Sequence, residues 1–165
     1  MVDIAKTEGS LWTAVHTKAR CEKKVAQHCR SLEFNVYLPL RRKVGRYQRR
    51  TVETFLPMFP GYVFVQIPEG DNHLVQRCNG VARLIPVNSV TEKRLIADLC
   101  NVQQLEKAEV EREVVVQPEL VPGTPVLVRT GPLQGTYGII ERRNDRTRIV
   151  VNVELLGQSA YVDLD

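Results

Sequence analysis

The chain has 165 residues, of which 43% are hydrophobic, enough for one ordinary core and a smaller second one. Its four cysteines form no CxxC pair, so neither a zinc cluster nor a disulfide framework is indicated. No apolar run reaches the roughly 18 residues that cross a bilayer, and the N-terminus lacks the pattern of a secretory signal. We therefore expect a cytoplasmic protein without a membrane segment, a cofactor or a metal.

The charge is unevenly distributed along the chain. Residues 1–107 carry 17 Lys and Arg against 10 Asp and Glu, a net charge of +7, whereas residues 108–165 carry 6 against 9, a net charge of −3. Within the first part, residues 18–50 hold 11 basic and 2 acidic residues. Such a concentration is typical of a segment that binds a polyanion. The two parts of the chain are expected to contact different partners.

Periodicity predicts a strand, a helix and a second strand at the start of the chain. Residues 11–17 (LWTAVHT) alternate and are rich in residues that favour strands. Residues 20–32 carry an apolar stripe at helical spacing, formed by Cys21, Val25, Cys29 and Leu32. The two cysteines on this stripe are expected to be small core residues. Residues 35–38 return to strand, and Pro39 ends it.

Residues 40–55 (LRRKVGRYQRRTVETF) predict a projecting hairpin with two strand-forming arms around Gly45. Six of the ten residues 41–50 are Lys or Arg, and Tyr47 among them is able to stack on a base. This is more positive charge than solubility requires. A nucleic-acid contact is therefore favoured over a merely solvated face.

Residues 55–67 (FLPMFPGYVFVQI) predict the central strand, with an irregular backbone up to Gly61 because two prolines precede it. Strand alternation then separates two faces, with Val63, Val65 and Ile67 toward the core and Tyr62, Phe64 and Gln66 on the other side. Together with Phe59, the aromatic side chains form either a second packed layer or an apolar patch held for a partner. The residues alone leave both possibilities open; the family resemblance given below favours the patch, in which the rings are partly exposed.

The rest of the first part predicts two helices around another strand. Asp71 is a candidate cap for a short helix that ends at Asn79-Gly80. Residues 81–87 predict a strand, and Ser89-Val-Thr-Glu92 has the form of a capping box for a second amphipathic helix. This order of elements predicts an α+β sandwich, with helices packed on an antiparallel sheet.

The second part predicts a small β-structure after a linker. Residues 108–118 are the best linker candidate, which gives an N-terminal domain over 1–107 and a C-terminal domain over 119–165. Four extended segments separated by turn residues predict a small antiparallel barrel: 124–130, 136–142, 148–155 and 159–164. Because these segments are rich in β-branched residues, we expect a stable barrel rather than a helical form.

Several of these elements together resemble the NusG family. They are residues 12–17 with the basic helix that follows, Phe59-Pro-Gly-Tyr-Val-Phe-Val65, Asn79-Gly-Val81, and the KOW-type segment from Pro122 to Gly135. The resemblance covers nearly the whole chain and implies an N-terminal NGN domain followed by an SH3-like KOW barrel. The chain length and the arginine-rich hairpin are more similar to a specialised RfaH-like paralogue than to the housekeeping protein.

The resemblance implies a transcription factor that binds the clamp helices of the largest subunit of elongating bacterial RNA polymerase and suppresses pausing or termination. It also implies contact with upstream or non-template DNA, and recruitment of the ribosomal protein NusE or of Rho through the KOW domain. We expect a monomer. The residues matched to the clamp contact are His16, Phe59, Tyr62 and Phe64, and those matched to the gate loop across the channel are Asp71, Asn72 and His73. The residues matched to nucleic acid are Lys18, Arg20, Lys23 and Lys24, and the hairpin adds Arg41, Arg42, Lys43, Arg46, Arg49 and Arg50. The residues matched to the KOW partner surface are Leu133, Leu155, Leu156 and Gln158.

Two other classes of function are weighed against this one. An enzyme is disfavoured because no nucleophile elbow, motif-placed carboxylate pair or glycine-rich phosphate loop occurs, and the three histidines have no metal-ligand spacing. A ribosome-associated RNA-binding protein is the alternative, because KOW segments also occur in ribosomal proteins and a basic hairpin suits rRNA. An aromatic patch on the N-terminal sheet discriminates between the two, since it predicts polymerase binding.

Overall fold

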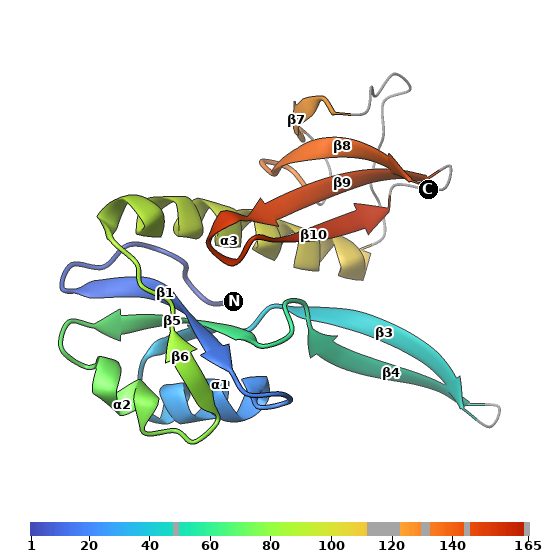
Figure 1. Cartoon of the computed structure of the whole chain (residues 1–165). Helices are drawn as coiled ribbons and strands as arrows, with labels where there is room; N and C mark the ends of the chain where they lie inside the picture. The colour runs from blue at the N-terminus through green and yellow to red at the C-terminus, as the bar shows by residue number, and fades with distance from the viewer. Residues whose placement is uncertain (48–49, 112–122, 130–132, 144–145, 164–165) are drawn as a thin grey trace. The chain divides into compact units, whose positions relative to one another are not determined.

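The computed structural model describes residues 1–47, 50–111, 123–129, 133–143 and 146–163 (Figure 1). The chain forms two compact units, Met1–Ile96 and Ala97–Asp165, and the division falls inside helix α3 (Ser89–Glu111). Because α3 continues to Glu111, the first four residues of the expected linker at 108–118 are helical. No helix among the described residues is long and apolar enough to span a membrane.

The first unit is built on a four-stranded antiparallel sheet with the strand order β2-β5-β1-β6. Its strands are β1 (Ser10–Thr17), β2 (Asn35–Tyr37), β5 (Tyr62–Pro68) and β6 (Val81–Leu84). Helices α1 (Glu22–Ser31) and α2 (Asn72–Gln76) complete the unit together with the start of α3. The predicted α+β class is confirmed, although β6 ends three residues earlier than expected.

The main core of this unit lies between α1, α2 and one face of the sheet. Val63, Val65 and Ile67 of β5 pack there with Val25 and Cys29 of α1, and all five side chains are buried. The two faces of β5 and the inward stripe of α1 thus lie where the sequence periods placed them. Cys29 is a core residue, as expected, and its burial together with the nearby Cys78 raises its pKa from 9.0 to about 11.

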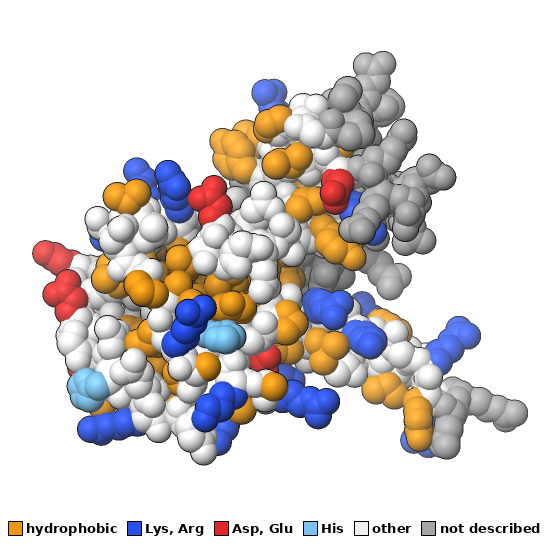
Figure 2. All heavy atoms as spheres, in the orientation of Figure 1, with side chains coloured by type: hydrophobic (Ala, Val, Ile, Leu, Met, Phe, Trp, Pro, Cys, Tyr) orange, Lys and Arg blue, Asp and Glu red, His pale blue; other side chains and the backbone are white. Residues whose placement is uncertain are grey.

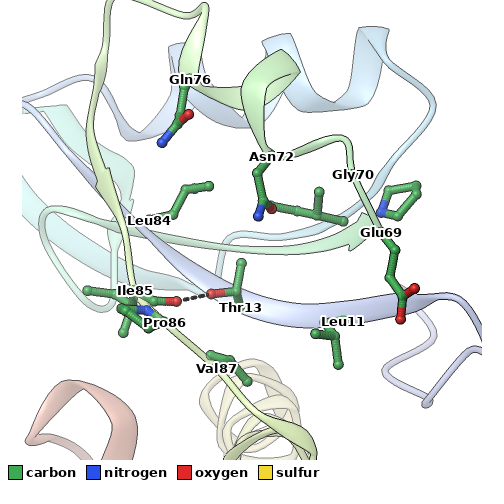
Figure 3. Close-up of a pocket in the computed structure, with 12 residues that line it drawn as sticks. Leu11, Thr13, Glu69, Gly70, Asn72, Gln76, Leu84, Ile85, Pro86 and Val87 are labelled. Carbon is green, nitrogen blue, oxygen red and sulfur yellow. Dashed lines mark hydrogen bonds between the residues drawn. The ribbon is translucent and has the colours of Figure 1, made fainter.

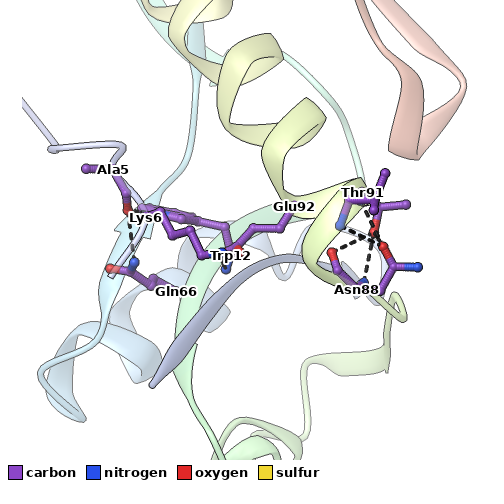
Figure 4. A network of polar contacts seen from close by, with 8 residues as sticks. Ala5, Lys6, Trp12, Gln66, Asn88, Thr91 and Glu92 are labelled. Carbon is purple, nitrogen blue, oxygen red and sulfur yellow. Dashed lines mark hydrogen bonds and ion pairs between the residues drawn. The ribbon is translucent and has the colours of Figure 1, made fainter. Parts of the chain in front are cut away.

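A polar network ties the start of α3 to the sheet (Figure 4). The side chain of Glu92 is fully buried, and its Oε1 accepts the backbone N–H of Trp12 at 3.0 Å. The indole N–H of Trp12 and the amide of Gln66 both donate to the carbonyl of Ala5. A carboxylate buried at this position satisfies a sheet donor that would otherwise lack a partner.

The helix α3 starts differently from the prediction. Asn88, and not Ser89, is its cap: the Asn88 side chain accepts the N–H groups of Val90 and Thr91 at 3.0 and 2.9 Å, and Thr91 Oγ1 accepts the N–H of Asn88 (Figure 4). The capping box is therefore Asn88 to Thr91. The Glu92 carboxylate that the predicted box required is instead bonded to Trp12.

The hairpin of β3 (Leu40–Tyr47) and β4 (Arg50–Pro57) projects from the sheet of the first unit (Figure 1). Its predicted position is confirmed, but its turn is not centred on Gly45. Gly45 lies within β3 and pairs with Val52, and the last pair of the ladder is Tyr47 with Arg50. Each arm of eight residues spans roughly 25 Å at the usual rise of an extended strand.

The second unit contains a four-stranded antiparallel sheet with the order β10-β9-β8-β7. Its strands are β7 (Pro125–Leu127), β8 (Tyr137–Arg143), β9 (Arg146–Val153) and β10 (Gln158–Asp163), with a 3-10 turn η1 (Glu154–Leu156) between the last two. The buried face of this sheet includes Ile140, Ile149, Val151 and Ala160. Each of the four predicted extended segments contains a strand, although β7 is shorter than the predicted 124–130, and Glu154 and Leu155 of the predicted 148–155 belong to η1.

Candidate functional site

The Phe59–Tyr62 turn fixes the position of the first candidate surface. The N–H of Tyr62 donates to the carbonyl of Phe59 at 3.1 Å, and Gly61 has φ +86°, so Pro60 and Gly61 occupy the central positions of a type II turn. Glu22 Oε1 of α1 accepts the N–H of Gly61 at 2.8 Å. The Gly61 carbonyl in turn accepts the N–H of Thr17 at 2.8 Å. The turn is thereby fastened to both α1 and β1.

Directly after this turn, Tyr62 lies against His16 of β1. The two residues are cross-strand partners, and their ring centroids are 5.1 Å apart with the planes inclined by 31°. Both side chains are half-buried. On the other side of His16, the register of β6 places Arg83, whose side chain is exposed. These three residues form a continuous row, called here the Tyr62–His16–Arg83 row.

Sequence reasoning missed Arg83. The sequence predicted a strand over residues 81–87, but only the pairing of β6 with β1 shows that Arg83 lies opposite His16. Because directly opposed residues on one face are close enough for their side chains to interact, the guanidinium adds a cation beside the two rings.

The expected exposure of Phe59 and Phe64 is wrong. Phe59 is 2% exposed and Phe64 is fully buried. The ring of Phe64 meets Phe59 edge to face at 6.1 Å and lies 6.3 Å from the ring of Tyr37. Aromatic rings at these distances form a packed cluster. Of the two possibilities that the sequence left open, a second packed layer therefore describes Phe59 and Phe64, and the row with Tyr62 is what remains at the surface.

The gate-loop candidates lie at the start of α2, beside a pocket of about 430 Å³ (Figure 3). Asn72 lines this pocket, and His73 is exposed with its Nδ1 3.0 Å from the Gly70 carbonyl. Asp71 occupies the N-cap position without a side-chain capping bond. The pocket's apolar lining comes from three segments: Leu11 of β1, Ile67 and Pro68 at the end of β5, and Leu84, Ile85, Pro86 and Val87 at and after the end of β6.

The basic residues of the first helix region are exposed, and two of them make contacts. Lys23 Nζ donates to the Phe55 carbonyl at the base of the hairpin at 3.2 Å. Lys24 Nζ donates to Asn79 Oδ1 at 2.5 Å, beside the turn before β6. Lys18 and Arg20 are exposed as well. Figure 2 shows Lys and Arg side chains over this region and along the hairpin, so the structure brings the two basic groups together at Lys23.

The hairpin candidates differ in their surroundings. Arg41, Lys43, Arg46 and Arg50 are exposed. Arg42 forms an ion pair with Glu53 of the opposite strand, which compensates its charge locally. Arg49 lies outside the described residues.

The candidates for the partner surface of the second unit are divided by their burial. Leu133 is fully buried, so its expected place on a contact surface is wrong: the side chain fills the interior of the described fold. Leu155 and Leu156 are half-buried on η1, and Gln158 is half-buried at the start of β10. Gly157 joins these elements in the left-handed conformation, with φ 60°.

The sequence analysis did not single out an exposed apolar stripe on the second sheet. Tyr137 is 64% exposed and Tyr161 53%, and the register aligns Ile139 with Val150 and Val150 with Tyr161 across three strands. The Arg148 guanidinium lies 4.2 Å from the centre of the Tyr161 ring. Among the described residues, no group of three or more His, Cys, Asp or Glu side chains is placed to hold a metal ion.

Comparison with known proteins identifies the family. The family model described as "Transcription termination factor nusG" matches residues 10–106. The structure of NusG from Thermotoga maritima is similar with a TM-score of 0.54 and 24% sequence identity, covering 94% of this chain and 93% of that one. A structure titled "Crystal Structure of MjSpt4:Spt5 complex conformation A" has a TM-score of 0.31 and 16% identity, with 92% of each chain covered. No curated protein sequence matches. Because the family model matches more than half of the sequence, the chain belongs to the NusG family of non-enzymatic transcription factors, whose members bind RNA polymerase.

Proposed function

We propose that the protein is a specialised, RfaH-like member of its family that binds elongating bacterial RNA polymerase in the cytoplasm and suppresses pausing or termination. The Tyr62–His16–Arg83 row carries this proposal. It presents two half-buried rings and an exposed guanidinium on a sheet, in a position fixed by the Gly61–Glu22 bond. Aromatic and arginine side chains are the groups that most often dominate binding energy in protein interfaces.

The row is proposed to dock on the clamp helices of the largest subunit. Phe64 and Phe59 support it, because Phe64 lies two residues along from Tyr62 on the same face of β5 and its buried ring packs on that of Phe59. Asp71, Asn72 and His73 are proposed to face the gate loop across the DNA channel. Asn72 lines a pocket with an apolar lining and the neighbouring His73 is exposed, which supports this assignment.

The basic residues of the first helix region and the hairpin are proposed to contact upstream or non-template DNA. The exposed side chains of Lys18, Arg20 and Arg41 and the concentration of charge in residues 18–50 support this role. Domain boundaries at 107 and 119, a monomeric state, and recruitment of NusE or Rho through Leu155, Leu156 and Gln158 complete the proposal.

The test is binding to a reconstituted elongation complex. Tyr62→Ala should weaken binding by about 2 kcal/mol or more, roughly thirtyfold in Kd, and His16→Ala and Arg83→Ala should each weaken it by a smaller amount. Val90→Ala is the matched control, because Val90 is an exposed apolar residue on α3, 63% exposed and outside the row. Dwell time at a pause site is measured with the same variants. Unchanged polymerase binding by Tyr62→Ala would refute the docking surface, and tight rRNA binding in its place would favour the ribosomal alternative.

A further inference from the structure

The pairing of β3 with β4 gives the hairpin two chemically different faces. Directly opposed residues of an antiparallel ladder share a face, and faces alternate along each strand. The register runs from Arg41 opposite Leu56 to Tyr47 opposite Arg50. One face, called here the Tyr47 face, therefore carries Arg41, Lys43, Gly45, Tyr47, Arg50, Val52, Thr54 and Leu56. The other, called the Phe55 face, carries Arg42, Val44, Arg46, Thr51, Glu53 and Phe55.

The positive charge of the two faces differs. On the Phe55 face, the ion pair between Arg42 and Glu53 neutralises one of the two cations. The Tyr47 face carries Arg41, Lys43 and Arg50, all exposed, and the described ladder places no carboxylate on it. These cations are spread over roughly 20 Å of strand. The Tyr47 face is therefore complementary to a chain of phosphates, whereas the Phe55 face is close to balanced.

Tyr47 adds a second recognition element to the same face. Its side chain is 69% exposed at the end of the ladder. A free aromatic ring beside cations is the arrangement that binds single-stranded nucleic acid, because a ring can stack on an unpaired base. In a duplex the bases are already stacked on one another.

We propose that the Tyr47 face binds an unpaired DNA strand, with Arg41, Lys43 and Arg50 on its phosphates and Tyr47 stacked on one base. The choice of DNA rests on the proposed function, because an elongating polymerase exposes an unpaired DNA strand. The cations of the first helix region extend the path, since Lys23 is bonded to the hairpin base at Phe55. The contact is independent of sequence, because phosphates and base planes are common to all strands.

The experiment measures binding of the full chain to fluorescein-labelled dT20 in the absence of polymerase, over a range of salt concentrations. The double variant Arg41→Gln/Lys43→Gln should lose at least tenfold in affinity, and its log–log salt slope should fall by about 1.4, as expected for two lost single-strand phosphate contacts. Arg42→Gln/Arg46→Gln is the matched comparison: it removes the same charge from the same strand but from the Phe55 face, and its loss of affinity should be at least threefold smaller than that of the Tyr47-face variant.

The stacking contact is tested with a second matched pair. Tyr47→Ala should weaken dT20 binding by about 5- to 150-fold without changing the salt slope, and Tyr47→Phe should restore it. Phe55→Ala, which removes a 48% exposed ring from the other face, should have little effect. Thermal melting shows that each variant is folded.

The proposal would be overturned if the variants of the two faces lost equal affinity, or if the unmodified chain showed no measurable binding at low salt. Tighter binding to a dT20·dA20 duplex or to U20 RNA than to dT20 would also overturn it. Because polymerase is absent, these results do not depend on the docking surface. If Tyr62→Ala leaves polymerase binding unchanged and Tyr47→Ala weakens dT20 binding, the proposed docking surface is refuted and the Tyr47 face is not. The reverse pattern would refute the Tyr47 face alone.

Discussion

Replacing Phe64 and Tyr62 by alanine distinguishes an interior ring from a surface ring only two residues away. Phe64 is fully buried, with the rings of Phe59 and Tyr37 at 6.1 and 6.3 Å, and truncation of such a residue costs about 3–5 kcal/mol. Tyr62 is half-buried and has His16 as its ring neighbour, so Tyr62→Ala should cost about 1–2 kcal/mol. For a unit of about 100 residues, 1 kcal/mol corresponds to roughly 4–8 °C in Tm. We therefore expect Phe64→Ala to lower Tm by roughly 12–40 °C and Tyr62→Ala by roughly 4–16 °C.

The assay is calorimetric unfolding of the full chain, with urea unfolding at 25 °C to give the free energies directly. Phe55→Ala is the control, because its exposed ring should contribute little to stability. Polymerase binding of each variant is then measured well below its own Tm, so that a lost surface contact is not confused with an unfolded fraction. If the two substitutions destabilise the protein equally, Phe59, Phe64 and Tyr37 are not a packed layer, and the reasoning that assigns docking to Tyr62 rather than to both rings is refuted.

Two further predictions concern the first unit. Asn88→Ala should destabilise the protein by about 1 kcal/mol in urea unfolding, because it removes the α3 cap. Ser89→Ala should change stability by less than about 0.5 kcal/mol. A larger effect of Ser89→Ala than of Asn88→Ala would show that Ser89 is the cap. Burial raises the pKa of Cys29 from 9.0 to about 11, so the unfolded chain loses this proton first and stability should fall as pH rises from 9 toward 11. A Cys29→Ala variant should lose less stability over that interval, and identical pH profiles would contradict the assignment.

Features that depend on local chemistry could be predicted from the sequence. The two faces of β5 follow from strand alternation, and the Pro60-Gly61 turn follows from the dihedral angles that these two residues favour. The stripe of α1 is equally local. These elements are correct because each depends on residues a few positions apart, whatever packs on them later.

Features that depend on distant partners could not be predicted. Ser89 and Asn88 both satisfy the signature of a helix cap, and the choice between them involves Glu92, whose carboxylate is engaged by a backbone N–H 80 residues earlier in the chain. Phe64 and Tyr62 share one face of one strand, yet only Phe64 is covered by the ring of Tyr37 from β2, in addition to that of Phe59 from the turn before β5. Arg83 joins the candidate site through strand pairing alone. In each case the deciding contact is tertiary, and periodicity holds no information about it.

Adjacent residues of α1 connect the two proposed surfaces. Glu22 is buried and accepts the N–H of Gly61 in the turn that carries Tyr62, while Lys23 is exposed and donates to the Phe55 carbonyl at the base of the hairpin. The Lys23 bond contributes little energy at the surface, but α1 itself is held by Val25 in the core. The docking row and the hairpin base therefore belong to one packed body. A factor docked through Tyr62 would hold the Tyr47 face near an unpaired strand at a high effective concentration, so that even weak affinity of the hairpin for DNA is sufficient.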